Sequence, residues 1–249
     1  MEAKKNVFVS GGSGGIGSEV VREIFSRGHN VIFTYYKGKE ETDRLYEELK
    51  QKAQDNQWIY AFQCDLSDEQ HVRKMINENK KLFSTIDVLI NNAGRISPAP
   101  QFLIMADMNL WWTIFHNNIG CVVNVTRAIV PFMIRRKKGT IVNVTSLSGI
   151  SGDPGQSAYA ASKAAIINLS KTLNKELCSF GITVNCVSPG LIDTKMADEA
   201  SKTYREGIIK YSMAKRLGRA DEVANIIVYL AVEAPDYLVN QNITISGGL

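Results

Sequence analysis

The sequence is poor in cysteine, histidine and proline, and these shortages exclude several classes of protein. Its 4 cysteines have no CxxC spacing, which argues against a disulfide framework or a cysteine-based metal site. Its 3 histidines, His29, His71 and His116, are scattered, and we predict no metal site. No apolar run approaches the roughly 18 residues of a membrane span, and the N-terminus lacks the long apolar stretch of a secretory signal. We therefore expect a cytoplasmic protein that binds no membrane and keeps its thiols reduced.

Neither sign of charge dominates the sequence. The net charge of +4 is too small to indicate a nucleic-acid partner, although it suits an anionic ligand or an acidic protein. A hydrophobic fraction of 45% and a charged fraction of 22% are ordinary for a globular protein with a buried core. With 6 prolines and no low-complexity stretch, nothing marks a linker, so we predict a single domain over residues 1–249.

Short apolar runs alternate with amphipathic or charged stretches along the chain. Strands that are continuously apolar belong to a sheet covered on both faces, and intervening helices make that sheet parallel. The pattern therefore predicts a doubly wound α/β fold. The expected strands are residues 6–10, 30–35, 58–63, 86–90, 139–144, 182–187 and 242–245. The expected helices are 16–27, 39–54, one that begins at 67, 109–136, 158–179 and 221–231, and the less regular segment 191–219 is a candidate mobile flap.

A glycine-rich segment, residues 10–17, stands at the first turn from strand to helix. Glycines let backbone N–H groups approach a pyrophosphate, and the helix N-terminus adds a favourable partial positive charge. An ordinary glycine turn is the alternative, but a strand before and a helix after are the context that a dinucleotide site requires.

Tyr159 and Lys163 lie four residues apart in a strongly helical stretch, which places both side chains on one face. A neighbouring ammonium favours the phenolate of a tyrosine, whose ordinary pKa is about 10. Such a tyrosine can exchange protons with a substrate oxygen near neutral pH, although the same pair also occurs on solvated surfaces. Ser146 follows a predicted strand, where the sheet edge lines a ligand crevice; capping a turn is its alternative role.

Several spaced motifs together resemble the short-chain dehydrogenase/reductase family. They are the glycines Gly11, Gly15 and Gly17, the segment Asn-Asn-Ala-Gly at 91–94, Ser146 thirteen residues before Tyr159, and the ending Ile-Ser-Gly-Gly-Leu. The resemblance covers nearly the whole chain and is strongest to 3-oxoacyl-(acyl-carrier-protein) reductases of fatty-acid and polyketide synthesis. It implies a Rossmann-like fold and an NAD(P)-dependent oxidoreductase.

The resemblance also implies roles for four side chains. Ser146 would hydrogen-bond the substrate carbonyl oxygen, and Tyr159 would donate a proton to it. Lys163 would lower the pKa of Tyr159 and hold the nicotinamide ribose. Asn118 would position a water that relays protons, although adjacent Asn117 and a purely structural hydrogen bond both stay open as alternatives.

The cofactor site implied by the resemblance favours NADP (NADPH) over NAD. The second strand ends in Tyr35, Tyr36 and Lys37, with no carboxylate before Glu40 to accept bonds from a ribose 2′-hydroxyl. Lys37 would stabilise a 2′-phosphate, whereas Gly14 stands where many NADP-binding relatives have arginine. The implied cofactor residues are Gly11, Ser13, Gly15, Ile16, Gly17, Tyr36, Lys37, Asp65, Leu66, Asn92, Ala93, Gly94, Tyr159, Lys163, Pro189, Gly190, Ile192 and Thr194.

The expected substrate walls are mostly apolar, which suits an acyl chain or another hydrophobic ketone better than a free sugar. They are residues 95–102, 147–156 and the flap around 196–204, and they supply Ile96, Pro98, Phe102, Leu147, Ile150, Met196 and Tyr204. The same apolar residues would also suit a core.

An acyl carrier protein is a partner implied by the resemblance, and so is a homotetramer formed through residues 223–230 and 243–245. Lys137, within the basic run 135–138, falls where relatives have a docking arginine, but Phe180 replaces a second one. Basic residues are also favourable at any helix C-terminus.

The function hypothesis is NADPH-dependent reduction of a 3-oxoacyl thioester, small-molecule or carrier-bound. One alternative is a dehydrogenase of a free secondary alcohol such as a sugar or steroid. Another is an inactive dinucleotide-binding sensor or scaffold, against which the presence of Ser146, Tyr159 and Lys163 argues.

Overall fold

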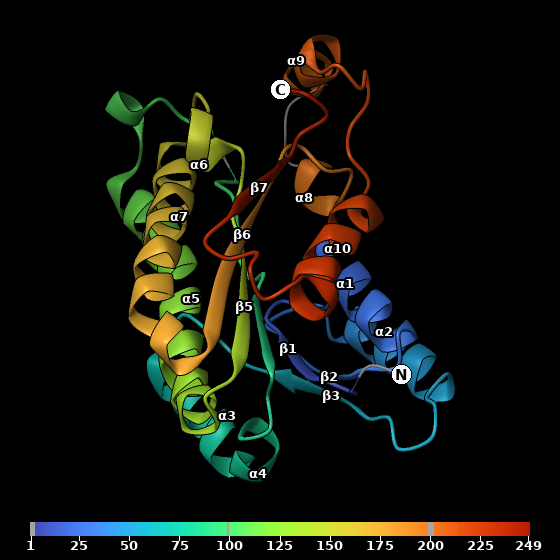
Figure 1. Ribbon diagram of the computed structural model, residues 1–249. Coiled ribbons are helices and arrows are strands. Elements are labelled where there is room, and N and C mark those ends of the chain that lie inside the picture. Colours follow the sequence, from blue (N-terminus) through green and yellow to red (C-terminus); the bar gives the residue numbers. More distant parts are fainter. Residues whose placement is uncertain (1–2, 99, 199–201) are drawn as a thin grey trace.

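Seven strands form one sheet in which every neighbouring pair is parallel. The computed structural model describes residues 3–98, 100–198 and 202–249, without the side chains of Met196 and Asp198, so the expectation for Met196 lies outside it. The strand order is β3-β2-β1-β4-β5-β6-β7 (Figure 1). The strands are β1 Asn6–Val9, β2 Asn30–Tyr35, β3 Ile59–Gln63, β4 Val88–Asn91, β5 Gly139–Val144, β6 Ile182–Pro189 and β7 Asn242–Ile245.

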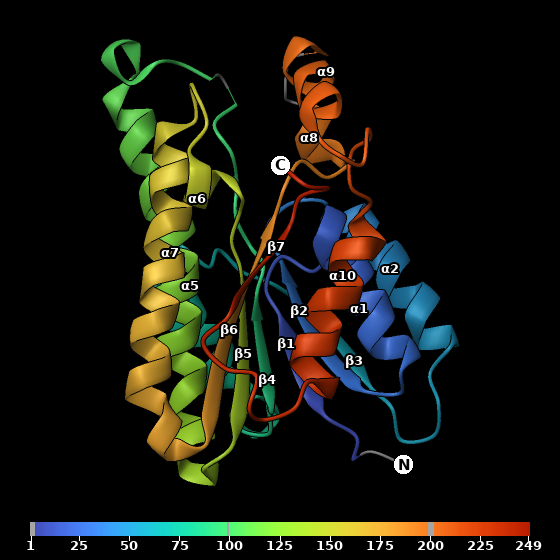
Figure 2. The ribbon, with the colours of Figure 1, turned by 45° about the horizontal axis from the view of Figure 1, so that its top comes forward.

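Helices cover both faces of the sheet, which confirms the predicted doubly wound α/β fold. Helices α3, α5 and α7 lie on one face, and α1, α2 and α10 lie on the other (Figures 1 and 2). The helices are α1 Gly15–Ser26, α2 Lys39–Gln51, α3 Glu69–Glu78, α4 Lys80–Phe83, α5 Met108–Arg136, α6 Ser148–Ser151, α7 Ser157–Leu177, α8 Lys195–Asp198, α9 Lys202–Tyr211 and α10 Ala220–Val228. Short 3-10 turns, η1 Leu103–Met105 and η2 Cys178–Phe180, and a π turn, η3 Tyr229–Glu233, complete the elements.

All seven predicted strands are present, whereas the short helices α4, α6, α8 and α9 were not predicted. The helix predicted to begin at residue 67 begins at Glu69, because the carboxylate of Asp68 accepts hydrogen bonds from the N–H groups of Gln70 and His71. Helix α2 ends at Gln51 rather than at residue 54, and α7 ends at Leu177 rather than at residue 179.

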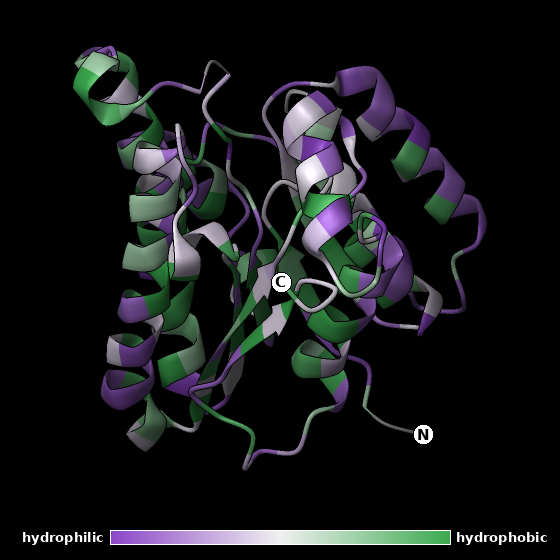
Figure 3. Ribbon diagram, turned by 90° about the horizontal axis from the view of Figure 1, so that it is seen from above, coloured by the Kyte–Doolittle hydropathy of each residue, from purple (hydrophilic) through white to green (hydrophobic). Residues whose placement is uncertain are grey.

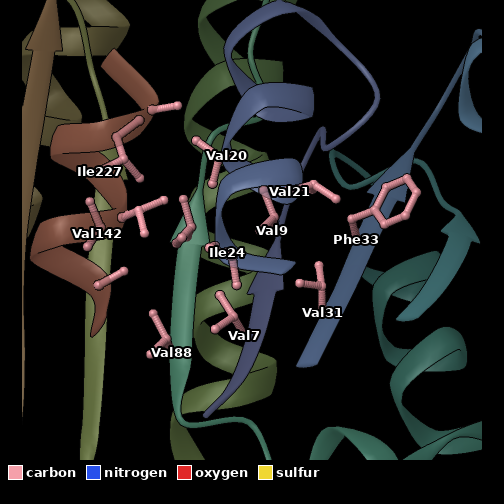
Figure 4. Close-up of a cluster of buried hydrophobic side chains, with 14 of the residues drawn as sticks. Val7, Val9, Val20, Val21, Ile24, Val31, Phe33, Val88, Val142 and Ile227 are labelled. Carbon is pink, nitrogen blue, oxygen red and sulfur yellow. The ribbon is translucent and has the colours of Figure 1, made fainter. Parts of the chain in front are cut away.

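Alternation along the strands divides the core into two clusters, one on each face of the sheet. Val7 and Val9 of β1 face α1 and α10, whereas Phe8 between them packs on the side of α5 (Figure 4). Figure 3 shows hydrophobic residues on the central strands and hydrophilic ones on outer turns of the helices. Such strands fix the sheet, and their carboxyl ends carry the loops of the site.

Helix α5 differs from the expectation that no segment could span a membrane. By length and composition alone it is long and apolar enough to do so. In the structure it packs between α3 and α7 and buries Ile114, Val125 and Met133 against the sheet. Such contacts are typical of a core helix in a globular protein.

Candidate active site

The turn between β1 and α1 is a backbone cradle that only glycines can build. Gly11 has a φ of 64°, and a Cβ on Gly17 would lie 2.2 Å from the carbonyl oxygen of Gly11. The first turn of α1 has no side-chain cap, since Gly14 stands at the N-cap position. Its N–H groups and the positive end of the helix therefore suit a bound phosphate.

The segment after β4 is tied to this cradle. The hydroxyl oxygen of Ser10 accepts hydrogen bonds from the N–H groups of Asn92 and Ala93, both at 2.9 Å. The amide of Asn92 donates to the carbonyl oxygens of Ser10 and Gly11, at 3.1 and 3.0 Å. Strands β1 and β4 are neighbours at the point where the strand order reverses, which is where ligands bind in open α/β sheets.

The ends of β2 and β3 supply the residues expected around the adenosine. Tyr36 is 58% exposed and Lys37 is exposed beside it, so both are accessible to a ligand. Asp65 accepts bonds from the N–H and hydroxyl of Ser67, at 3.0 and 2.6 Å, while Leu66 is buried. The carboxylate of Asp65 is thus held in place by its own turn.

The end of β6 brings the remaining expected cofactor residues to the cradle. Pro189 ends the strand, and its carbonyl oxygen accepts a bond from the N–H of Leu147 at 2.8 Å. A Cβ on Gly15 would lie 2.8 Å from Thr194, so the segment that begins after Gly190 packs directly on the glycine turn. Ile192 is buried and forms an isolated bridge with Gly218.

Ser146, Tyr159 and Lys163 meet at the carboxyl edge of the sheet. Ser146 follows β5 and hydrogen-bonds the phenol of Tyr159, which stands on α7. Lys163 is only 4% exposed; its Nζ lies 5.7 Å from the centre of the Tyr159 ring and donates to the carbonyl oxygen of Val144 at 3.0 Å. Ser146 also accepts a bond from the N–H of Ser148 at 3.1 Å, so it caps a turn as well.

Asn118, on α5, joins this group. The sequence left open whether Asn118 or its neighbour Asn117 takes this position. Asn118 is buried, its Oδ1 accepts from the N–H of Arg95 at 2.9 Å, and its Nδ2 donates to the Arg95 carbonyl and to Ser162, both at 3.0 Å. A Cβ on Gly94 would lie 3.2 Å from Nζ of Lys163 and 3.4 Å from Oδ1 of Asn118. The buried side chain that faces Lys163 is therefore that of Asn118.

The expectation that Lys163 lowers the pKa of Tyr159 stays a prediction, because burial has the largest effect on that pKa in this structure. Burial raises the pKa of Tyr159, the hydrogen bond from Ser146 opposes that rise, and the charge of Asp153 adds to it. Burial also lowers the pKa of Lys163 to about 8. The phenol is thus kept protonated, which is the form that a proton donor needs.

Two of the three expected substrate walls, residues 95–102 and 147–156, lie against each other. The N–H of Ser97 donates to the side chain of Gln156 at 3.1 Å, and the N–H of Gln101 donates to the carbonyl of Gly155 at 3.1 Å. Phe102 and Ile150 are 64% and 53% exposed, so neither belongs to a core. The described apolar wall residues Ile96, Pro98 and Leu147 are partly or fully exposed.

Sequence reasoning missed a polar group at this mouth. Asp153 accepts hydrogen bonds from the hydroxyl of Ser148 and from the phenol of Tyr204 on α9. Tyr204 was expected to be an apolar wall residue. No motif marks Asp153; a carboxylate in an otherwise apolar predicted wall was the only signal.

The basic run 135–138, which includes the position of a docking arginine in relatives, lies at the end of the sheet opposite Ser146. Lys137 ends α5 and precedes β5, whereas Ser146 follows the far end of that strand. A strand of this length spans about 20 Å, and Phe180 likewise precedes β6. Lys137 and Phe180 therefore lie about one strand length from the site of their own chain.

The match to the short chain dehydrogenase family extends over residues 5–205. The chain belongs to the short-chain dehydrogenase family. It is therefore an NAD(P)-dependent oxidoreductase that acts on a carbonyl or hydroxyl group, as the sequence predicted.

Relatives within the short-chain dehydrogenase family match the chain almost end to end. The 3-oxoacyl-[acyl-carrier-protein] reductase FabG of Staphylococcus aureus is 34% identical over 249 residues, 100% of this chain and 99% of the relative. Nodulation protein G of Rhizobium meliloti is 34% identical over 98% of this chain and 96% of the relative.

Solved structures of short-chain dehydrogenases confirm the fold. A 3-oxoacyl-[acyl-carrier protein] reductase from Brucella melitensis superposes with a TM-score of 0.88 at 27% identity, over 98% of this chain and 91% of that one. Another such reductase from the same organism, with bound NAD, gives a TM-score of 0.89 at 26% identity, over 100% and 92%.

Proposed function

We propose that the chain reduces a 3-oxoacyl thioester to the 3-hydroxyacyl form with NADPH. The observation that carries the proposal is the hydrogen-bonded pair Ser146 and Tyr159 beside Lys163, at the sheet edge where the glycine cradle lies. Relatives that are 34% identical over the full chain are 3-oxoacyl-[acyl-carrier-protein] reductases, which supports the choice of substrate.

The glycine turn fits a nicotinamide dinucleotide, because Cβ atoms on Gly11, Gly15 and Gly17 would meet Ala93, Thr194 and the Gly11 carbonyl oxygen. Glycines at these positions therefore keep the tight turn whose N–H groups suit a pyrophosphate. Bound there, the nicotinamide supplies the hydride for the carbonyl carbon. Tyr36 and Lys37 would hold the adenosine ribose and its 2′-phosphate, and Asp65 and Leu66 would border the adenine. Gly94, Pro189, Ile192 and Thr194 would line the nicotinamide end together with Ser13, Ile16, Asn92, Ala93 and Gly190.

Ser146 and Tyr159 act on the substrate oxygen. Both hydroxyls donate hydrogen bonds to the carbonyl oxygen, where negative charge develops. Tyr159 then gives its proton to that oxygen, and its raised pKa keeps the proton available at neutral pH. Before substrate binds, the hydroxyl of Ser146 donates to the phenol and holds it in position; on binding, its single proton would turn to the carbonyl oxygen.

Lys163 and Asn118 support the proton transfer from Tyr159 to the substrate oxygen. Lys163, with a pKa near 8, can carry a proton at neutral pH and return one toward Tyr159. It would also hold the nicotinamide ribose. Asn118 faces Lys163 across Gly94 and, through Ser162, contacts the carbonyl of Tyr159, so it fixes both catalytic side chains and would position a relaying water.

The segment around α8 and α9, residues 191–219, is proposed as the substrate flap of a single domain. It begins on the glycine turn at Thr194 and reaches the mouth at Tyr204, so its movement would open the substrate site. A cytoplasmic homotetramer is part of the same proposal. Among the residues expected to join the copies, Val223 and Ile227 are buried against α1 of their own chain. Tyr229 and the edge strand β7 are therefore left for contacts between copies.

The deciding experiment follows NADPH and NADH oxidation with acetoacetyl thioesters, comparing the carrier-bound form with the coenzyme A form. Faster turnover of NADPH with either thioester than with free ketones supports the proposal, and a preference for the carrier-bound form adds the carrier protein as partner. Activity on free secondary alcohols alone would replace it with the alcohol dehydrogenase alternative. Cofactor binding without turnover on any ketone would indicate the inactive sensor.

A further inference from the structure

A carboxylate stands at the substrate mouth, beside exposed apolar residues of the two walls that the structure describes in full but for residue 99. Asp153 lies in the turn between α6 and α7 and is partly buried. It accepts hydrogen bonds from Ser148, two residues after Ser146, and from Tyr204 of α9. Three segments thus meet at this side chain: the loop after β5, the turn before α7 and the proposed flap.

Asp153 is linked to the reacting centre through Ser148, whose hydroxyl donates to the carboxylate and whose N–H donates to Oγ of Ser146 at 3.1 Å. The negative charge of Asp153 therefore lies near Ser146. It adds to the rise in the pKa of Tyr159, and it raises the pKa of Tyr204 together with burial. Its hydrogen-bond donors are two neutral hydroxyls, and no ion pair to it occurs among the residues that the structure describes. The carboxylate is therefore held in place without being neutralised, close enough to Tyr159 to influence a charge there.

We propose that Asp153 determines specificity by rejecting substrates that carry a carboxylate next to the reacting carbonyl. It would favour neutral 3-oxoacyl esters and thioesters over free 3-oxo acids, and this inference deepens the proposed function on which it rests. The carboxylate of a 3-oxo acid is two bonds from the ketone carbon. A ketone held by Ser146 and Tyr159 therefore brings that charge within a few ångströms of the site that Asp153 influences.

Repulsion at this range is large enough to select substrates. Two like charges about 6 Å apart at an effective dielectric constant of about 20 disfavour binding by up to roughly a hundredfold. Partial exposure of the mouth reduces that factor, so we expect a discrimination of about tenfold or more. Neutral thioesters escape the repulsion and meet only the apolar walls.

The same contacts offer a competing role, in which Tyr204 and Asp153 tie α9 to the mouth and the charge is irrelevant. The two roles separate on substitution. Asp153→Asn removes the charge and keeps the size of the side chain, whereas Tyr204→Phe removes the tie and keeps the charge. Asp153→Glu keeps the charge, and Asp55→Asn removes an exposed carboxylate from the loop between α2 and β3 as a matched control.

The experiment measures kcat/KM of the full chain with NADPH for acetoacetate, ethyl acetoacetate and the acetoacetyl thioester of N-acetylcysteamine. The native chain should prefer both neutral substrates over acetoacetate. Asp153→Asn should raise kcat/KM for acetoacetate. The ratio of kcat/KM for the neutral substrates to that for acetoacetate should therefore fall at least tenfold. Asp153→Glu, Tyr204→Phe and Asp55→Asn should keep the preference within about threefold.

An unchanged preference in Asp153→Asn would overturn the inference, and so would equal narrowing in Tyr204→Phe, which would assign the selectivity to the tie. If Asp153→Asn does not fold, Asp153→Ser is scored by the same criterion. Failure of the proposed function has a different signature, namely no turnover of ester or thioester by the native chain. The charge effect is then scored on an accepted free ketone and its carboxylate analogue.

Discussion

At the scale of single residues, the site depends on groups whose protonation is set by burial. Tyr159 and Lys163 were paired by spacing alone, but the structure places the ammonium against the Val144 carbonyl and the phenol against Ser146. Burial raises the pKa of the phenol and lowers the pKa of the ammonium, because it disfavours the charged form of each group. The phenol stays protonated, and the lysine can lose its proton near pH 8.

Tyr159→Phe should abolish measurable turnover and leave NADPH binding nearly unchanged. The variant removes the proton donor to the developing alkoxide, and losing one such donor typically costs about 3–4 kcal/mol in the barrier, a factor of 10² to 10³. Steady-state kinetics and cofactor fluorescence titration measure the two effects. Tyr237→Phe, at a residue that is 98% exposed, should change neither; retained activity in Tyr159→Phe would refute the assignment.

Lys163→Met should stabilise the cofactor-free protein at neutral pH by up to about 3 kcal/mol. The pKa of Lys163 falls from 10.5 to about 8 on folding, so the cost of burying its charge is fully present below pH 8. Between those pH values the unfolded chain binds more protons, and the native chain should gain stability as pH rises. The advantage of the variant should therefore vanish above pH 10.5. Urea unfolding across this pH range tests it, and exposed Lys175→Met should show no comparable trend.

Lys37→Glu should shift cofactor preference from NADPH toward NADH by at least about tenfold. The substitution replaces the cation expected at a 2′-phosphate with a carboxylate that accepts bonds from a ribose hydroxyl. The ratio of kcat/KM for the two cofactors is the measurement. Lys50→Glu, at the far end of α2, serves as the charge-matched control. An unchanged ratio would show that Lys37 does not contact the adenosine ribose.

At the scale of elements, the turn from β1 to α1 is the part of the site that backbone sterics determine. Gly17 and Gly14 differ sharply there: a Cβ on Gly17 would meet the Gly11 carbonyl oxygen at 2.2 Å, whereas nothing lies within 4 Å of one on Gly14. Each glycine in the motif thus has its own reason. The helix that follows supplies N–H groups only if this turn keeps its shape.

Gly17→Ala should destroy cofactor binding, while Gly14→Ala should weaken it less than about threefold. The added methyl group at Gly17 forces the turn away from α1, because a carbonyl oxygen cannot yield as a flexible side chain does. Calorimetric titration with NADPH and thermal unfolding measure binding and stability separately. Similar affinities in the two variants would contradict the cradle.

At the scale of the whole molecule, the surface is as informative as the core. The segment before α5 exposes consecutive apolar side chains, of which Ile104 is 93% and Met105 is 72% exposed. Contiguous apolar patches of this kind mark contact surfaces. The apolar residues of α10, by contrast, are mostly used within the chain.

We propose that this exposed apolar segment is a further contact between copies, in addition to Tyr229 and β7. Ile104→Asp should then lower the mass of the assembly in solution, because a charge in an apolar contact is costly. Analytical ultracentrifugation over a range of protein concentrations measures the effect. Met213→Asp, at an 82% exposed residue in the loop after α9, is the control. A native protein that stays monomeric at every concentration would remove both this prediction and the proposed homotetramer.

The strands, their parallel order and the glycine turn followed from the sequence, because continuous apolar runs and glycines at a strand end express local physical constraints. The helices α4, α6 and α8 did not, since elements of 4 residues are too short to show a period. Helix α9, of 10 residues, lies in the segment 191–219 that the sequence marked only as irregular. The exact start of α3 depended on which side chain caps the helix, and that residue is Asp68.

The sequence by itself determined the doubly wound fold and the identities of Ser146, Tyr159 and Lys163, because spacing along strands and helices is local information. Only the tertiary structure decided that Asn118 rather than Asn117 faces Lys163, and that Asp153 and Tyr204 meet at the mouth. These facts depend on which segments distant in sequence become neighbours, and on burial, which sets the charge of a side chain only after the chain has folded.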